Sequence, residues 1–117
     1  MSEDQSDREW RFYIEDMTGF CERVQNFTRD ITREKFLTEP MRYDATVRNI
    51  ELIGEAATHV PAAIRQAAKS IPWRMVIATR NKLIHGYAGI DDDVLWSIVE
   101  TDIPALLTAL RELQSNR

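Results

Sequence analysis

The chain has 117 residues, a length that suits one domain with a hydrophobic core of its own, and we expect a single domain over residues 1–117. Hydrophobic residues make up 44% of the chain and there are only four Gly and four Pro, which excludes a fibrous or disordered protein and favours a compact, largely helical one. The net charge of −4 speaks against a protein that coats nucleic acid without specificity.

Neither a membrane span nor a signal peptide is expected. No apolar run approaches the roughly 20 residues that cross a bilayer, and the start, Met1-Ser2-Glu3-Asp4, is polar and acidic. The lone Cys21 excludes an internal disulfide and is typical of the reducing cytoplasm, where we place the protein. One cysteine and two histidines, His59 and His85, give no basis for a metal cluster, so neither a metal nor another cofactor is expected.

Residues 8–31 predict a long amphipathic helix. Positions that share one helix face recur every three or four residues, at Trp10, Ile14, Met17, Cys21, Val24, Thr28 and Ile31. The stripe is longer than a domain of this size needs on one face. Part of it is therefore available to a second subunit.

A second helix is predicted from Met41 through Val60, with Thr38 as its cap, Pro40 in its first turn and Pro61 breaking or restarting it. Gly54 lies in the middle of this helix, where glycine costs about 1 kcal/mol relative to alanine, so we expect a close approach of another helix there. The neighbouring Glu55 is either a surface carboxylate or a buried partner of an arginine, and the surface is favoured. Residues 61–69 predict a short helix.

Asp91-Asp92-Asp93 precede the last predicted helix, whose apolar residues run from Val94 to Leu113. Carboxylates cap helix starts and meet the positive end of the helix, so we interpret the three acids as a cap rather than a metal loop. Pro104 predicts a kink. Because no strand pattern appears, we predict an all-α fold, an antiparallel bundle of four main helices and one short helix.

The remaining helix is predicted to start at Ile71-Pro72-Trp73 and to carry the octet at residues 80–87, Arg-Asn-Lys-Leu-Ile-His-Gly-Tyr. Gly86 is the expected end of the helix. Asn81 and His85 are four residues apart and share a face, and Arg80 lies one position round from Asn81. A guanidinium, an amide and an imidazole can thus converge, a combination suited to binding a phosphate and moving a proton near neutral pH.

Spacing alone also fits a simpler interpretation. Basic residues near the end of a helix are ordinary partners of its dipole, and a histidine before glycine is often only part of a helix end. The charge distribution leaves the same choice open. Residues 29–82 hold ten of the 15 Lys and Arg against six acidic residues, and they could line an electropositive groove or simply form solvated helix faces.

Taken together, these stretches closely resemble the HepT-like toxins of the HEPN superfamily. The octet has the form R-x4-H-x-Y of the superfamily signature, and Ile53-Gly54-Glu55-Ala56-Ala57 and Ile71-Pro72-Trp73 precede it at matching distances. The Asp-rich start of the last helix and Trp96 extend the resemblance over nearly the whole chain. The octet alone is a loose signature, but its combination with the flanking stretches is specific.

The resemblance implies a HEPN-like fold and a homodimer whose octets face each other across a cleft. It also implies a metal-independent endoribonuclease that cuts tRNA or mRNA as the toxin of a two-gene module. Its partner would be a MntA-type nucleotidyltransferase antitoxin, which neutralises the toxin by transferring AMP to the tyrosine of the motif. Carried over by position, Arg80 and His85 are catalytic, Asn81 is supportive and Tyr87 is the modified residue. Arg48, Arg74 and Lys82 are candidates for binding RNA.

The expected reaction is transesterification. His85 takes the proton of the ribose 2′-OH, which attacks the adjacent phosphorus, and Arg80 stabilises the added negative charge. Two alternatives stay open. The chain could be a non-catalytic helical dimer that binds a nucleotidyltransferase or a nucleotide, or a purely structural dimerisation domain.

Overall fold

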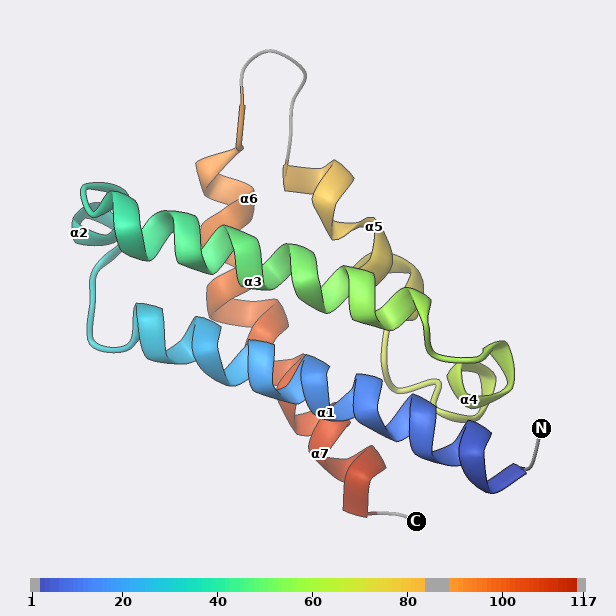
Figure 1. Ribbon diagram of the computed structural model, residues 1–117. Helices are drawn as coiled ribbons and strands as arrows, with labels where there is room; N and C mark the ends of the chain where they lie inside the picture. The colour runs from blue at the N-terminus through green and yellow to red at the C-terminus, as the bar shows by residue number, and fades with distance from the viewer. Residues whose placement is uncertain (1–2, 84–88, 116–117) are drawn as a thin grey trace.

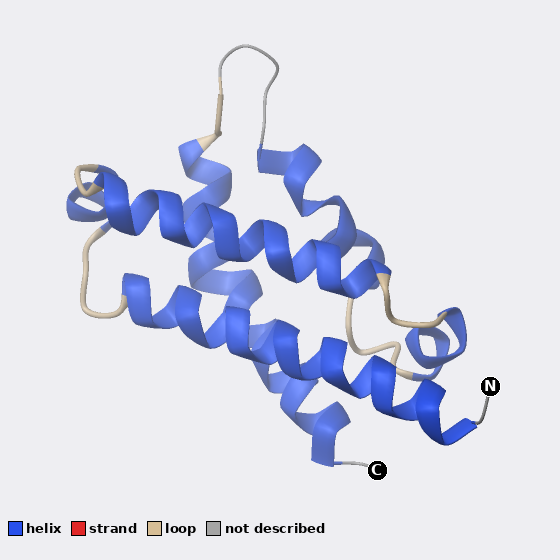
Figure 2. Ribbon diagram, in the orientation of Figure 1, coloured by secondary structure: helices blue, strands red, loops and turns tan. Residues whose placement is uncertain are grey.

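The computed structural model describes residues 3–83 and 89–115, with the backbone alone for residues 3–7 and Arg80. Every regular element in these ranges is a helix (Figures 1 and 2). The elements are α1 (Glu3–Thr28), α2 (Arg33–Leu37), α3 (Pro40–Thr58), α4 (Ala62–Ala67), α5 (Trp73–Leu83), α6 (Asp92–Ser97), the π-helical segment η2 (Ile98–Asp102) and α7 (Ile103–Ser115). None of the helices in the described part of the chain is long and apolar enough to cross a membrane.

The long helices α1 and α3 lie side by side and run in opposite directions, while α7 crosses behind α1 (Figure 1). The predicted stripe of α1 forms the centre of the core, because Ile14, Met17, Cys21 and Val24 are at most 1% exposed. Helices of the same chain therefore cover this face. The expectation that part of the stripe is free for a second subunit is wrong for these residues.

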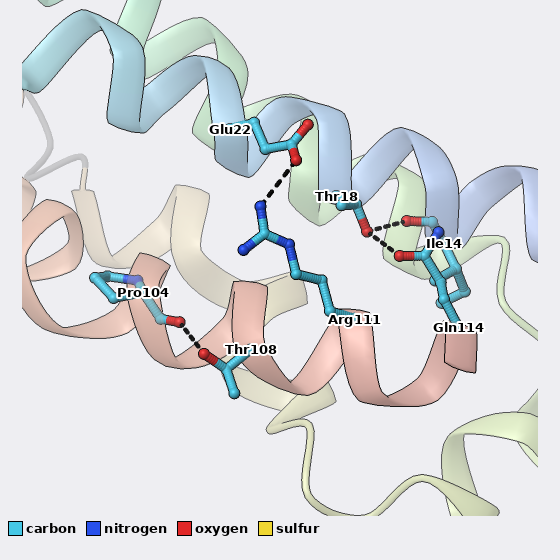
Figure 3. Close-up of polar contacts among 7 residues, drawn as sticks. All are labelled: Ile14, Thr18, Glu22, Pro104, Thr108, Arg111 and Gln114. Atoms are coloured by element: carbon cyan, nitrogen blue, oxygen red, sulfur yellow. Dashed lines mark hydrogen bonds and ion pairs between the residues drawn. The ribbon is translucent and has the colours of Figure 1, made fainter. Parts of the chain in front are cut away.

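Polar contacts fix α7 against α1 beside the apolar core (Figure 3). The Thr18 hydroxyl lies 3.1 Å from Oε1 of Gln114, and Nη2 of Arg111 lies 2.9 Å from Oε2 of Glu22. Both pairs join residues that are about ninety positions apart in the sequence. They fix the rotation of α7 on α1, which apolar packing alone specifies less sharply.

Between α1 and α3 the chain forms a helix that the sequence did not predict. Thr32 begins α2 by accepting a hydrogen bond from the Lys35 backbone at 3.1 Å, and Phe36 is fully buried. Thr38 ends α2, and Glu39 is the residue before α3. The prediction of Thr38 as the cap of α3 is therefore wrong, whereas Pro40 does occupy the first turn, as predicted.

The predicted close approach at Gly54 is confirmed. A Cβ atom added there would lie 3.0 Å from the carbonyl oxygen of Val76, so the missing side chain lets the backbones of α3 and α5 meet. Glu55 is exposed, as expected. This contact sets the position of α5, the helix that carries the start of the octet.

Gly19 and Gly54, the glycines within the described helices, allow two substitutions to be compared. Gly54→Val should destabilise the protein by about 1–3 kcal/mol, since overpacking must push α5 away. Gly19→Ala should stabilise it by about 1 kcal/mol, because nothing lies within 4 Å of a Cβ added at that site. Urea unfolding measures both, and equal effects of the two substitutions would contradict the close approach.

The last predicted helix forms, with a change of helix type near Pro104. Asp91 caps α6, since its Oδ1 accepts a hydrogen bond from the Val94 backbone at 3.2 Å, as predicted. Pro104 has no N–H to donate, and the hydrogen-bond register widens just before it: the N–H of Ile103 donates to the carbonyl of Ile98, five residues earlier. A π-helical segment, η2, therefore lies just before Pro104, the residue at which a kink was predicted.

Cys21 gives a prediction about pH. Its side chain is fully buried, and burial, with Glu22 as a smaller cause, raises the pKa of the thiol to about 12. In the unfolded chain the thiol has a pKa of about 8.5. The thiol's contribution to stability is therefore fully present below that pH and is lost as the pH rises towards 12. Between pH 9 and 11 wild type should lose up to about 1.4 kcal/mol per pH unit more than Cys21→Ala in urea unfolding. Parallel curves would contradict this.

Candidate functional site

The start of α5 is firmly positioned, as the Ile71-Pro72-Trp73 pattern predicted. Ile71 and Trp73 are buried, and the indole Nε1 of Trp73 donates to the carbonyl of Ala68 at 3.0 Å. The same carbonyl accepts the backbone N–H of Ile71 at 3.2 Å. These bonds close the turn between α4 and α5, so the direction of α5 is fixed from its first residue.

α5 has one buried side and one exposed side. Trp73, Val76 and Leu83 are at most 8% exposed, whereas Asn81 and Lys82 lie open to solvent. Arg80 belongs to the helix between Val76 and Leu83. His85, Gly86 and Tyr87 lie outside the described residues, so the predicted convergence of Arg80, Asn81 and His85, the helix end at Gly86 and the orientation of Tyr87 stay predictions.

The chain on both sides of residues 84–88 is anchored. Leu83 is 1% exposed, and its carbonyl accepts a 2.7 Å hydrogen bond from the backbone N–H of Asp91. Gly89 has φ of +84°, a left-handed conformation that favours glycine. The end of α5 and the start of α6 are thus joined directly, and the second half of the octet is attached to two fixed points.

Each of the three consecutive aspartates has a structural partner. Asp91 caps α6, Asp92 accepts a hydrogen bond from the Tyr43 hydroxyl, and Asp93 pairs with Arg33. Burial and the adjacent Asp92 carboxylate raise the pKa of Tyr43. The bonds from α2 and α3 hold the first turn of α6, and with it one end of the octet segment. No group of three or more His, Cys, Asp or Glu within residues 3–83 and 89–115 could hold a metal ion.

The three cations predicted to bind RNA do not share a hollow. Arg48 lines one between α3 and α5, Lys82 lies at an apolar groove between α5 and α7, and Arg74 lines a third beside α4. Arg65 and Lys69 join Arg74 there. Sequence reasoning counted both residues as basic but did not place them in a site.

Carboxylates lie beside much of the remaining basic charge in the middle of the chain. Arg33 pairs with Asp93, and Arg42 approaches Glu39 to 2.9 Å. Lys35 lies 3.7 Å from the same Glu39. Of the two interpretations left open for residues 29–82, a long electropositive groove is therefore not what these contacts favour, and a smaller basic cluster remains at α4 and α5.

Comparison of the sequence with known proteins finds a family and several relatives. The family model for HepT-like ribonucleases ("Ribonuclease HepT-like") matches residues 17–113. A probable ribonuclease HepT of Thermococcus cleftensis is 38% identical over 92% of this chain and 97% of its own length. A putative RNase of Methanocaldococcus jannaschii is 35% identical over 86% of the chain and 93% of its own length. A putative RNase of Caldanaerobacter subterraneus is 32% identical over 88% of the chain and 92% of its own length. No solved structure matches.

The helical bundle formed by the described residues and the Arg-x4-His octet fit the class that this match indicates, the HEPN-type ribonucleases. The chain belongs to the HepT-like ribonuclease family. The match covers α5, the octet and the start of α6 in one continuous stretch.

Proposed function

We propose that this protein is a metal-independent endoribonuclease that acts as the toxin of a toxin–antitoxin pair. The observation that carries the proposal is the Arg80-x4-His85 pattern, which starts in the anchored helix α5 of a HepT-like ribonuclease chain. The named relatives support ribonuclease activity. The hydrogen bond between the backbones of Asp91 and Leu83 supports a site that is anchored at both ends of residues 84–88.

In the proposed reaction, neutral His85 removes the proton from a ribose 2′-OH. The 2′-oxygen attacks the adjacent phosphorus, and the bond to the 5′-oxygen breaks to leave a 2′,3′-cyclic phosphate. Arg80 stabilises the negative charge of the phosphorane, and the exposed Asn81 holds a phosphate oxygen through its amide. Proton transfer of this kind contributes about 10²- to 10⁴-fold in rate.

A single histidine cannot serve as base and acid in the same step. We propose that the protein is a homodimer in which the second copy's His85, or water, protonates the leaving 5′-oxygen. The apolar groove between α5 and α7, lined by Ile50, Val76, Ile103 and Leu106, supports this arrangement, since it runs beside the helix that carries Arg80. Met75 also lines the groove and is 50% exposed. An α5-to-α5 contact brings the two octets close together.

Met75→Glu should therefore weaken the dimer by about tenfold or more, because a carboxylate at an apolar interface loses its hydration. Met41→Glu is the control, since Met41 is 87% exposed at the start of α3 and does not line the groove. Light scattering during size exclusion measures both. A dimer that survives Met75→Glu but not Met41→Glu would place the interface elsewhere.

The proposed antitoxin is a nucleotidyltransferase that transfers AMP to the hydroxyl of Tyr87. AMP adds bulk and a negative charge seven residues after Arg80. The phosphate of AMP on Tyr87 can pair with the Arg80 guanidinium and exclude the RNA backbone. Modification would then stop cleavage by occupying the site.

The test is to incubate the purified protein with an RNA and with DNA of the same sequence, both in excess EDTA. Cleavage of RNA alone, with 2′,3′-cyclic phosphate ends, is the expected result, because DNA lacks the nucleophile. Mass spectrometry first confirms that the sample carries no AMP on Tyr87. Binding of RNA without any cleavage would instead favour a non-catalytic module.

A further inference from the structure

A basic hollow lies where α4 turns into α5. It measures about 630 Å³ and is open to solvent; Arg65, Lys69 and Arg74 line it together with Gln66, Trp73 and Ile77. None of its lining residues is acidic. The walls come from two helices that the bonds to the Ala68 carbonyl hold in a fixed relation. The three cations therefore face one volume without moving α4 relative to α5.

The positive charge in this hollow is not neutralised within the part of the chain that the structure describes. Within the described residues, Arg65, Lys69 and Arg74 form no ion pair, whereas Arg33, Lys35 and Arg42 all do. The Nε atom of Arg65 is buried and has no hydrogen-bond partner. A buried N–H donor without an acceptor is unfavourable, and an acceptor that reached it would satisfy it.

The hollow continues towards the octet along one side of α5. Arg74, Ala78 and Asn81 are spaced by four and three residues, so they lie on one line of the helix. Along the axis Arg74 and Asn81 are about 10 Å apart, at about 1.5 Å per residue. A nucleic-acid strand that enters the octet beside Asn81 can therefore reach the hollow within a few nucleotides.

We propose that this hollow binds the phosphate backbone of the RNA substrate outside the site of cleavage. The inference rests on the proposed ribonuclease function and adds Arg65 and Lys69 to its substrate contacts. Phosphate recognition fits the lining because two guanidiniums and an ammonium supply positive charge and hydrogen-bond donors, which phosphate oxygens accept. The contact holds RNA in position and does not select its sequence.

The first measurement is RNA affinity as a function of salt, in a His85→Ala background that does not cut. The variant R65Q/K69Q/R74Q should weaken binding on the order of 10- to 100-fold at 0.1 M salt and lower the salt slope by about 2. The control R23Q/R29Q/K35Q removes the same charge from exposed positions on α1, on α2 and in the turn between them. It should bind more tightly than the hollow variant by most of that factor. Equal slopes and affinities for the two variants would overturn the proposal.

The second measurement separates this inference from the proposed function. On a long RNA the hollow variant should raise KM about tenfold or more and leave kcat unchanged, because phosphate contacts act on binding. A dinucleotide, which is too short to reach Arg74, should be cut equally by wild type and variant. If wild type cuts no RNA, the proposed function fails, whereas an unchanged KM in an active enzyme refutes the hollow alone. Loss of nucleotidyltransferase binding with full RNA affinity would reassign the hollow to a protein partner.

Discussion

His85→Ala is expected to lower RNA cleavage by about 10²- to 10⁴-fold, the usual contribution of a positioned proton-transfer group. RNA affinity should change little, since the imidazole acts in the reaction more than in binding. A gel assay with labelled RNA in EDTA measures the rate, and anisotropy measures the affinity.

The chain offers a matched control, because it contains only one other histidine. The ring of His59 stacks on Tyr13 with centroids 4.8 Å apart, at the end of α3. His59→Ala should keep full cleavage. Equal losses in both variants would show that folding rather than chemistry is affected, and full activity in His85→Ala would remove His85 from the mechanism.

A mixed dimer extends this test to the second copy. A dimer with one wild-type octet and one carrying His85→Ala should have well below half of the wild-type rate if each site needs the other copy's acid. Half of the rate would mean that each site works alone with water. The mixed dimer tests only the acid, and the role of His85 as base is tested by the His85→Ala variant alone.

Tyr87→Phe is expected to abolish neutralisation by the nucleotidyltransferase while leaving cleavage intact, because the variant lacks the hydroxyl that would receive AMP. Mass spectrometry after incubation with ATP and the antitoxin should show the added AMP on wild type alone. Cleavage assays on the same samples should show inhibition of wild type and none of the variant.

The other two tyrosines are informative controls. The Tyr43 hydroxyl donates to Asp92, and Tyr13 is partly buried against His59. Tyr13→Phe should be modified and inhibited like wild type. Inhibition of Tyr87→Phe without added AMP would show that the antitoxin acts by binding, and would overturn the modification model.

Much of the fold was readable because its signals are local. The spacing from Trp10 to Val24 specified the buried side of α1, and Pro72 marked the start of α5. Gly54 predicted a close helix contact because glycine within a helix needs a packing reason. Asp91 predicted a helix cap because the hydrogen bond that a cap accepts comes from a residue only three positions further along the chain.

Errors arose where the deciding contacts come from distant parts of the chain. Helix α2 is five residues long, too short for a periodic pattern. It forms around Phe36, whose ring centroid lies 5.6 Å from that of Tyr43 and 5.3 Å from that of Trp96. Trp96 is sixty residues away, so no local pattern could report this contact.

By itself, the sequence determined the helical class, the position of α5 and the combination of octet and flanking stretches that indicates the family, because helix periodicity, caps and short motifs depend on neighbouring residues. The tertiary structure alone decided which cations are neutralised and which stay available. Arg33 meets a carboxylate sixty residues away, whereas Arg65, Lys69 and Arg74 are brought together by a turn and meet none of the described ones. Electrostatic pairing depends on distance in space, which residue spacing along the chain does not specify.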